Sequence, residues 1–211
     1  MRIVSFNKEI VQYIKRKSLE NIDRKILDVG CGKGDYTYFF GRRNKVIGVD
    51  LQNVVKEKYR NFNFQIADAT SLPFQDNTFD VVISFDVIEH IENDKKMVAE
   101  AYRVLKSGGK IFFGTPNKTR LSHFLLRLIG KPVKYPLNLG ESDKLGKIIH
   151  IREYTAEELR KVMKKSGFRD IKVIPFWFGL TFLKYGLIDP PKFLQKYCHY
   201  LFVEAAKNRK Y

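Results

Sequence analysis

Residues 25–34 read KILDVGCGKG, a short apolar run that leads into Gly30, Gly32 and Gly34. Glycines let a backbone adopt positive φ and approach a ligand closely. A dinucleotide-binding loop of the form G-x-G-x-x-G would place its third glycine at position 35, where the sequence has Asp35. No Gly-Lys-Ser/Thr follows, so the loop is not a P-loop either. The stretch therefore predicts a buried strand followed by a ligand-binding loop of another kind.

Further short apolar runs follow the first one, with helical patterns between them. The expected strands are 46–49, 62–67, 79–85 and 110–115, and the expected helices are 9–19, 35–42 and 93–105. Strands that alternate with helices indicate a parallel sheet covered on both faces. A helix over 155–166, opened by a Thr155–Glu158 capping box, should precede two final strands at 171–177 and 197–205.

Two aspartates stand at the ends of the second and third expected strands. Ligands of open α/β sheets bind beyond the carboxyl ends of the strands. Asp50 follows Gly30 by 20 residues, and a carboxylate there can accept both hydroxyl hydrogens of a ribose. Asp68, or the amide of Ala69, would meet an adenine edge. The series predicts a nucleoside-shaped site, and the alternative for each aspartate is a cap on a turn.

Residues 26–34 resemble motif I of the class I S-adenosylmethionine-dependent methyltransferases. Asp50-Leu51 resembles the ribose motif of that family, and Ala67-Asp68-Ala69 resembles its adenine motif. The runs 79–84 and 105–110 resemble the later motifs, so the resemblance covers residues 25–115 in order. It is strongest to the small-molecule branch that includes ubiquinone and menaquinone biosynthesis methyltransferases (methyltransferase type 11).

The resemblance implies an α/β, Rossmann-like three-layer sandwich formed by one domain over residues 1–211. Its seven-stranded, mostly parallel sheet would have the order 3-2-1-4-5-7-6 with strand 7 antiparallel. The implied cofactor is S-adenosylmethionine, and no metal site is expected. The implied cofactor-binding residues are Asp28, Gly30, Cys31, Gly32, Asp50, Leu51, Asp68, Ala69 and Phe85.

Three residues are candidates for the side that receives the methyl group. His90 follows the fourth expected strand, and a histidine pKa of about 6.5 suits a base near neutrality. We predict His90 as the catalytic residue, with a structural histidine at a strand-to-helix turn as the alternative. His150 and Tyr154 lie in a stretch that resembles the family just before its last helix, and we predict that both contact the substrate.

The positive charge of the chain is concentrated in its second part. The net charge is +16, and residues 117–211 hold 20 lysines and arginines against 8 acidic residues. This favours anionic partners, although lysine-rich surfaces are also common in heat-adapted proteins. Residues 117–150 and 178–196 are expected to be helical cap or lid insertions. The basic amphipathic pattern of 119–129 fits an anionic membrane surface, a lid, or packing on the sheet edge.

These patterns predict an S-adenosylmethionine-dependent methyltransferase with a small-molecule or lipid-like acceptor. Methylation of RNA (tRNA or rRNA) is the alternative, since nucleic acid would suit the basic, aromatic second part. A non-catalytic partner protein that binds S-adenosylmethionine is a third hypothesis. The only two cysteines, Cys31 and Cys198, favour a reducing cytoplasm. No stretch approaches the roughly 18–20 apolar residues of a membrane span.

Overall fold

The apolar runs of the sequence form a central sheet in this computed structural model, which describes residues 2–59, 61–142 and 146–208. The sheet order is β4-β3-β2-β5-β6-β12-β9. Its strands are β2 (Lys25–Val29), β3 (Lys45–Asp50), β4 (Asn63–Ile66), β5 (Phe79–Phe85), β6 (Leu105–Pro116), β9 (Arg169–Phe176) and β12 (Tyr200–Ala206). When these seven are numbered in chain order, the sequence is 3-2-1-4-5-7-6. The β12 strand is antiparallel to both of its neighbours, while β2 to β6 pair in parallel. The predicted fold class is confirmed.

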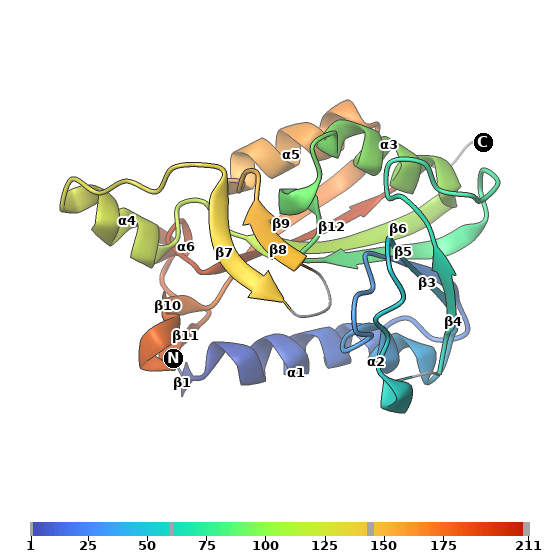
Figure 1. Cartoon of the computed structure of the whole chain (residues 1–211), viewed down its shortest axis with the longest axis horizontal. Helices are drawn as coiled ribbons and strands as arrows, with labels where there is room; N and C mark the ends of the chain where they lie inside the picture. Colours follow the sequence, from blue (N-terminus) through green and yellow to red (C-terminus); the bar gives the residue numbers. More distant parts are fainter. Residues whose placement is uncertain (1, 60, 143–145, 209–211) are drawn as a thin grey trace.

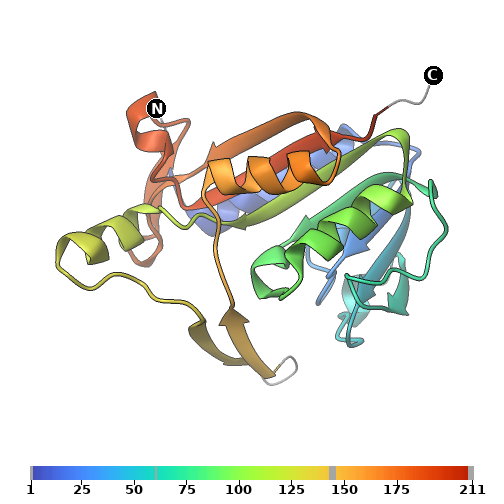
Figure 2. The same ribbon diagram turned by 90° about the horizontal axis from the view of Figure 1, so that it is seen from above.

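Helices cover both faces of this sheet, as Figures 1 and 2 show. Helices α1 (Phe6–Leu19) and α2 (Thr37–Gly41) lie on one face, and α3 (Asp94–Val104) and α5 (Ala156–Lys165) lie on the other. The predicted capping box opens α5: the Thr155 hydroxyl accepts from the Glu158 N–H, and the Glu158 carboxylate accepts from the Thr155 N–H. Because both orphan donors are satisfied, the helix begins at a defined residue.

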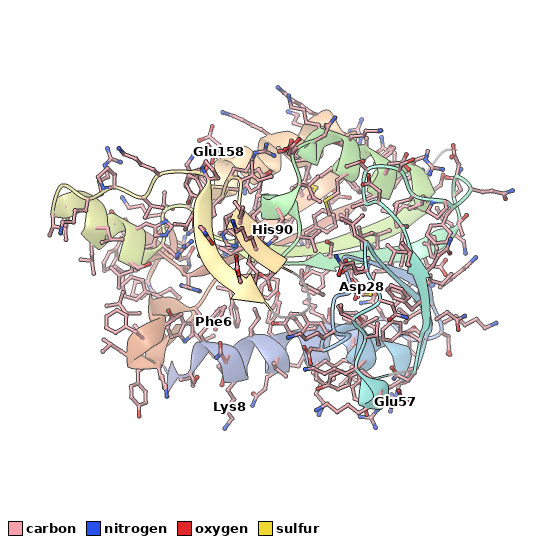
Figure 3. All side chains as sticks on the ribbon, in the orientation of Figure 1. Phe6, Lys8, Asp28, Glu57, His90 and Glu158 are labelled. Atoms are coloured by element: carbon pink, nitrogen blue, oxygen red, sulfur yellow. The ribbon has the colours of Figure 1, made fainter. Side chains whose placement is uncertain are left out.

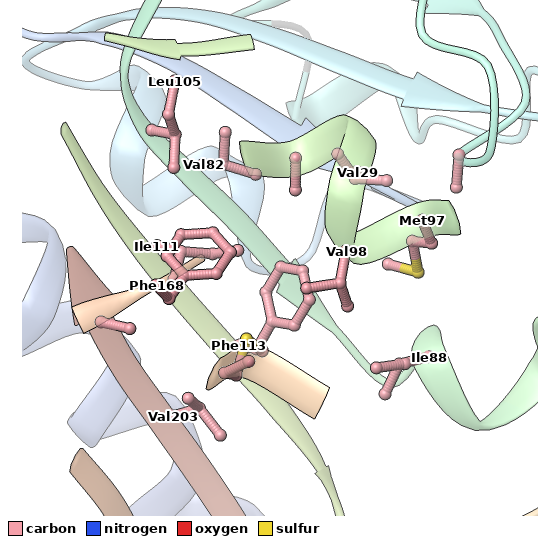
Figure 4. Packing of buried hydrophobic residues seen from close by; sticks show 14 of the residues in the cluster. Val29, Val82, Ile88, Met97, Val98, Leu105, Ile111, Phe113, Phe168 and Val203 are labelled. Carbon is pink, nitrogen blue, oxygen red and sulfur yellow. The ribbon is translucent and has the colours of Figure 1, made fainter. Parts of the chain in front are cut away.

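Two hydrophobic clusters hold the layers together, one on each face of the sheet. Val82 and Ile111 pack with Met97 of α3 in the first cluster, part of which is shown in Figure 4. The second cluster joins Ile14 of α1 to Ile83 and other residues of the sheet. Neighbouring residues of β5 thus enter opposite clusters, which explains why its sequence is apolar without alternation.

The segment 178–196 differs from the expected helical insertion. It forms β10 (Phe178–Leu180), the 3-10 turn η3 (Thr181–Leu183), β11 (Tyr185–Ile188) and the short helix α6 (Lys192–Gln195). The β11 strand pairs with β10 and with β1 (Arg2–Val4) in a small antiparallel sheet. Gly179 and Gly186 face each other there, and a Cβ at Gly186 would lie 2.5 Å from the ring of Trp177. The glycines let the buried indole rest on the backbone, which favours strands over a helix.

The first insertion holds helix α4 (Leu121–Leu128) and a hairpin of β7 (Leu137–Ser142) and β8 (Gly146–His150). Its residues 143–145 lie outside the described residues. The hairpin packs against the 3-10 turn η2 (Ile88–His90), where the Ile151 N–H donates to the Glu89 carbonyl at 2.9 Å. The insertion therefore covers the end of the sheet at which β5 finishes.

Helix α4 presents apolar side chains to solvent. Leu128 is 66% exposed and Ile129 is 67% exposed, and no residue of the helix is buried. Within the described residues, no helix combines the length and the apolar character that a membrane crossing requires.

Candidate active site

A cavity of about 1300 Å³ opens at the carboxyl ends of β2, β3 and β5 and continues beneath the β7–β8 hairpin. Ligand sites usually measure about 300–1,000 Å³, so this one has room for two small ligands side by side. All nine residues predicted to bind the cofactor line it: Asp28, Gly30, Cys31, Gly32, Asp50, Leu51, Asp68, Ala69 and Phe85. Its other end is lined by residues of α1, η2, β8 and β12.

The glycine loop follows β2 and forms the floor of the first end. The N–H groups of Gly30 and Cys31 both donate to the Val49 carbonyl, at 2.8 and 3.0 Å, and this turns the chain sharply out of the sheet. Gly30 has φ of +76°, and a Cβ there would lie 2.3 Å from Val87 Cγ2. Gly32 has φ of +50°, and a Cβ there would meet nothing within 4 Å. Gly30 is therefore required by packing, whereas Gly32 leaves space beside the cavity.

Asp50 is fixed at the end of β3 by two backbone donors. Its Oδ2 accepts from the Gly32 N–H at 2.8 Å, and its Oδ1 accepts from the Leu51 N–H at 2.7 Å. Each carboxylate oxygen has a second lone pair for a ligand hydroxyl. Leu51 is exposed on the cavity wall beside it. This arrangement suits a ribose diol next to an apolar ring face.

Asp28 and Asp68 take different roles at the same cavity. Asp28 is buried and accepts from the Thr37 hydroxyl at 2.6 Å, and burial raises its pKa to about 7. It stabilises the loop from behind. Asp68 lies at the cavity and accepts from the Thr70 N–H at 2.7 Å, a bond that lowers the pKa of Asp68. Asp68 therefore caps a turn and also lines the cavity.

His90 lines the second end of the cavity, beside the hairpin (Figure 3). Its Nδ1 lies 2.7 Å from the Ile149 carbonyl of β8. Since a carbonyl only accepts, Nδ1 carries the hydrogen, and Nε2 has the free lone pair. Burial lowers the pKa of His90, so the ring is neutral near pH 7 and able to accept a proton.

The two residues predicted to contact the substrate, His150 and Tyr154, do not line the cavity. His150 is buried, its Nδ1 lies 2.8 Å from Glu153 Oε1, and its ring centre is 4.8 Å from that of His90. Tyr154 is buried in the α3–α5 core, where its hydroxyl donates to Asp94 Oδ2 at 2.7 Å. Tyr154 therefore has a structural position, because its ring packs in the core and its one polar atom is already paired.

Three polar residues at this end were not singled out as site residues from the sequence. Asp86 follows β5 with φ of +56°, and burial raises its pKa to about 6 although solvent reaches the side chain through the cavity. Glu89 is fully buried, which raises its pKa; its Oε2 accepts from the Thr115 hydroxyl at 2.9 Å. Tyr200 is buried near Asp86, and burial together with that carboxylate raises the pKa of its hydroxyl. The run Asp86-Val-Ile-Glu89, directly after a central strand, was the available signal.

A buried network around Glu153 connects the first insertion to this end. The Glu153 carboxylate accepts from Arg120 and from the Tyr135 hydroxyl, the latter at 2.9 Å, in addition to His150. Burial alone would raise the pKa of Glu153, but the hydrogen bonds from His150 and Arg120 lower it to about 2. An ionised Glu153 holds His150 with its hydrogen on Nδ1.

The first part of the chain matches a known protein family. The family described as methyltransferase domain matches residues 27–113, the part that builds the glycine loop and Asp50. Residues 27–113 form a domain of the S-adenosylmethionine-dependent methyltransferases. The cofactor of these methyltransferases is S-adenosylmethionine.

Individual relatives agree with this family. The chain is 32% identical to a "probable S-adenosylmethionine-dependent methyltransferase" of Mycolicibacterium smegmatis, over 69% of this chain and 52% of the relative. It is 30% identical to an uncharacterized protein of Methanocaldococcus jannaschii, over 76% and 75%. It is 28% identical to the chloroplastic tocopherol O-methyltransferase of Arabidopsis thaliana, over 73% and 48%. The chain thus spans about half the length of the two methyltransferase relatives.

A solved structure shows the same fold over the whole chain. The crystal structure of a SAM-dependent methyltransferase from Thermotoga maritima superposes with a TM-score of 0.67 at 20% identity, and the match covers 96% of both chains. The likeness at this identity shows the shared fold.

Alanine substitutions at Gly30 and Gly32 should lower the stability of the fold by different amounts. Gly30→Ala should lower the free energy of unfolding by at least about 2 kcal/mol, because positive φ and the contact with Val87 both oppose a Cβ. Gly32→Ala should lower it by only about 1 kcal/mol, from φ alone. Urea unfolding measures both. Adding Val87→Ala should restore part of the stability of Gly30→Ala, and equal losses for the two glycines would contradict this account.

Proposed function

We propose that this protein transfers a methyl group from S-adenosylmethionine to a hydroxyl oxygen of a small, largely apolar acceptor. The observation that carries the proposal is that the nine predicted cofactor-binding residues and His90 line the same cavity. The relatives described above give no support for RNA methylation, and the turnover experiment below would detect it.

The donor end would be held by the loop after β2 and by the ends of β3 and β4. Asp50 would accept the ribose hydroxyls, and Leu51 would lie against the adenine. Asp68 and Ala69 would face the adenine edge, and the Gly30–Gly32 loop would approach the methionine part. When bound, S-adenosylmethionine supplies an electrophilic methyl group, and the electrons of the broken C–S bond stay on sulfur.

The acceptor end combines apolar walls with groups that accept a proton. Phe6 and Ile10 of α1 and Ile151 beyond β8 line it, and Asp86 and His90 lie at its inner end. A hydroxyl must lose its proton as its oxygen is methylated, and a base with a pKa near neutrality serves best. Asp86, whose pKa is raised to about 6, meets that need, and the neutral His90 offers a free lone pair to the proton. The relative that acts on tocopherol is an O-methyltransferase, which supports oxygen as the acceptor atom.

An anionic membrane surface is the proposed source of this acceptor. Exposed apolar side chains gather at the end of the molecule that holds α4, β10, β11 and α6 (Figure 1): Leu125, Leu128, Ile129, Phe182 and Phe193. Exposed cations lie among them at Arg127, Lys131, Lys184 and Lys192. Apolar side chains flanked by cations are typical of helices that lie on anionic lipid.

The donor assignment predicts a loss of affinity at Asp50. Asp50→Ala should weaken S-adenosylmethionine binding about 10–150-fold, because hydrogen bonds to a charged acceptor contribute about 1.5–3 kcal/mol. Isothermal titration calorimetry measures this. Asp170→Asn, at the start of β9 and away from the cavity, serves as the control and should bind as wild type does. Unchanged affinity in Asp50→Ala would remove the ribose assignment.

Turnover tests the reaction itself. Lipid, RNA, protein and small-molecule extract fractions should be incubated with methyl-labelled S-adenosylmethionine, and we expect label in an apolar small molecule. His90→Asn should lower that turnover about 10²–10⁴-fold, because a positioned base contributes this much, while cofactor affinity stays unchanged. Label found in RNA would favour the alternative reaction, and a His90→Asn enzyme as fast as wild type would leave His90 structural.

Vesicle binding tests the membrane proposal. The protein should sediment with vesicles that contain phosphatidylserine and not with purely zwitterionic ones. Arg127→Gln and Lys131→Gln should each weaken binding about 5-fold, since one cation near an anionic surface contributes about 1 kcal/mol. Lys45→Gln, at the start of β3, is the matched control. Equal binding to both vesicle types would contradict the proposal.

A further inference from the structure

We infer that Glu89, His90 and His150 form a binding site for a divalent transition-metal ion. One imidazole nitrogen from each histidine and one carboxylate oxygen of Glu89 all lie within 4.8 Å of one another. The ligands of a metal with bonds of about 2.1 Å stand roughly 3.0–3.4 Å apart. Small side-chain rotations would therefore bring the three ligands around one ion.

Glu89 supplies the strongest reason for an ion. Its side chain is fully buried, and its Oε1 has no hydrogen-bond partner within the described residues. His150 Nε2 lies 4.0 Å from this oxygen. In the tautomer that donates its Nδ1 hydrogen to Glu153, His150 presents an Nε2 lone pair to the carboxylate. An unpaired buried carboxylate is costly, and a cation between the two acceptors would satisfy both.

The hydrogen-bond partners of His90 and His150 are typical of metal-binding histidines. A metal-bound histidine almost always donates its second ring N–H to a carboxylate or a backbone carbonyl. His150 Nδ1 does so to Glu153 Oε1 at 2.8 Å, and His90 Nδ1 to the Ile149 carbonyl at 2.7 Å. Both rings are thus oriented, and one nitrogen of each remains for an ion.

The ligand set defines the class of ion. Two imidazoles and one carboxylate suit Zn²⁺, Mn²⁺, Fe²⁺ or Co²⁺, whereas Mg²⁺ and Ca²⁺ prefer oxygen ligands alone. Three protein ligands leave coordination positions open. His90 lines the acceptor end of the cavity, so an open position would face the acceptor.

The role of the ion rests on the proposed function, although its binding does not. An acceptor oxygen at the open position would lose its proton more easily, because a bound cation lowers the pKa of a coordinated hydroxyl. The substrate class then narrows to molecules whose methylated oxygen, or a neighbouring one, can coordinate a metal, such as catechols and hydroxy acids.

Metal binding is tested on the full chain without a polyhistidine tag, after treatment with a chelator. Calorimetry with Zn²⁺ and with Mn²⁺ should show one ion per chain. Co²⁺ should give the visible absorption of a nitrogen- and oxygen-ligated ion, without the sulfur charge-transfer band that Cys31 or Cys198 would produce. Glu89→Gln and His150→Asn should each weaken binding at least about 100-fold, and Glu153→Gln, which only positions His150, about 10–100-fold.

Two control variants separate the site from its surroundings. His123→Asn changes a histidine 3.7 Å from Glu153 that is not a ligand, and Glu92→Gln changes another cavity carboxylate. Both should bind metal as wild type does. Titration with S-adenosylmethionine confirms that each variant is folded, and His90→Asn provides a further ligand variant if His150→Asn does not fold.

The outcomes distinguish this inference from the proposed function. One ion per chain that depends on the three ligands supports the site, whether or not turnover is found. Absence of stoichiometric binding to wild type, or binding that survives all three ligand substitutions, overturns it. Turnover that persists unchanged in the chelator-treated, metal-free protein would overturn the catalytic role of the ion while leaving the methyltransferase proposal intact.

Discussion

The donor half of the cavity depends on one backbone carbonyl at the end of β3. The Val49 oxygen accepts from both Gly30 and Cys31, so the chain leaving β2 bends across the end of the neighbouring strand. The next residue of β3, Asp50, then receives the Gly32 N–H. This bend requires positive φ, which restricts the loop to glycine at the turning points. The glycine spacing is thus a consequence of two parallel strands ending side by side.

The sheet and the donor half could be predicted because their signals are local. Strand β5 is mostly apolar, and Asp50 is the last residue of its strand. The ribbon of β1, β10 and β11 could not be predicted in the same way, since Val4 pairs with Gly186 across most of the chain. The hydrogen bond between Arg120 and Glu153 also depends on tertiary folding, because no sequence periodicity connects residues so far apart.

Two buried glutamates at the acceptor end have opposite electrostatic surroundings. Glu153 is surrounded by donors, including the guanidinium of Arg120, and its pKa is lowered to about 2. Glu89 accepts from the Thr115 hydroxyl but has no cationic partner among the described residues, and burial raises its pKa. The first is a structural group whose charge is already compensated. The second lacks such compensation, so burial favours its neutral form unless a cation binds beside it.

The two halves of the cavity are formed by different parts of the chain, and this affects which half can change between related proteins. The donor half consists of backbone groups and strand ends of the shared sheet, so any chain with this fold can form it. The acceptor half takes Ile149 from a hairpin between β6 and α5, Tyr200 from β12 and Phe6 from α1. Insertions of this kind can change without disturbing the sheet. Under the proposed function, the segments between β6 and α5 and the groups they bring to His90 would therefore select the acceptor.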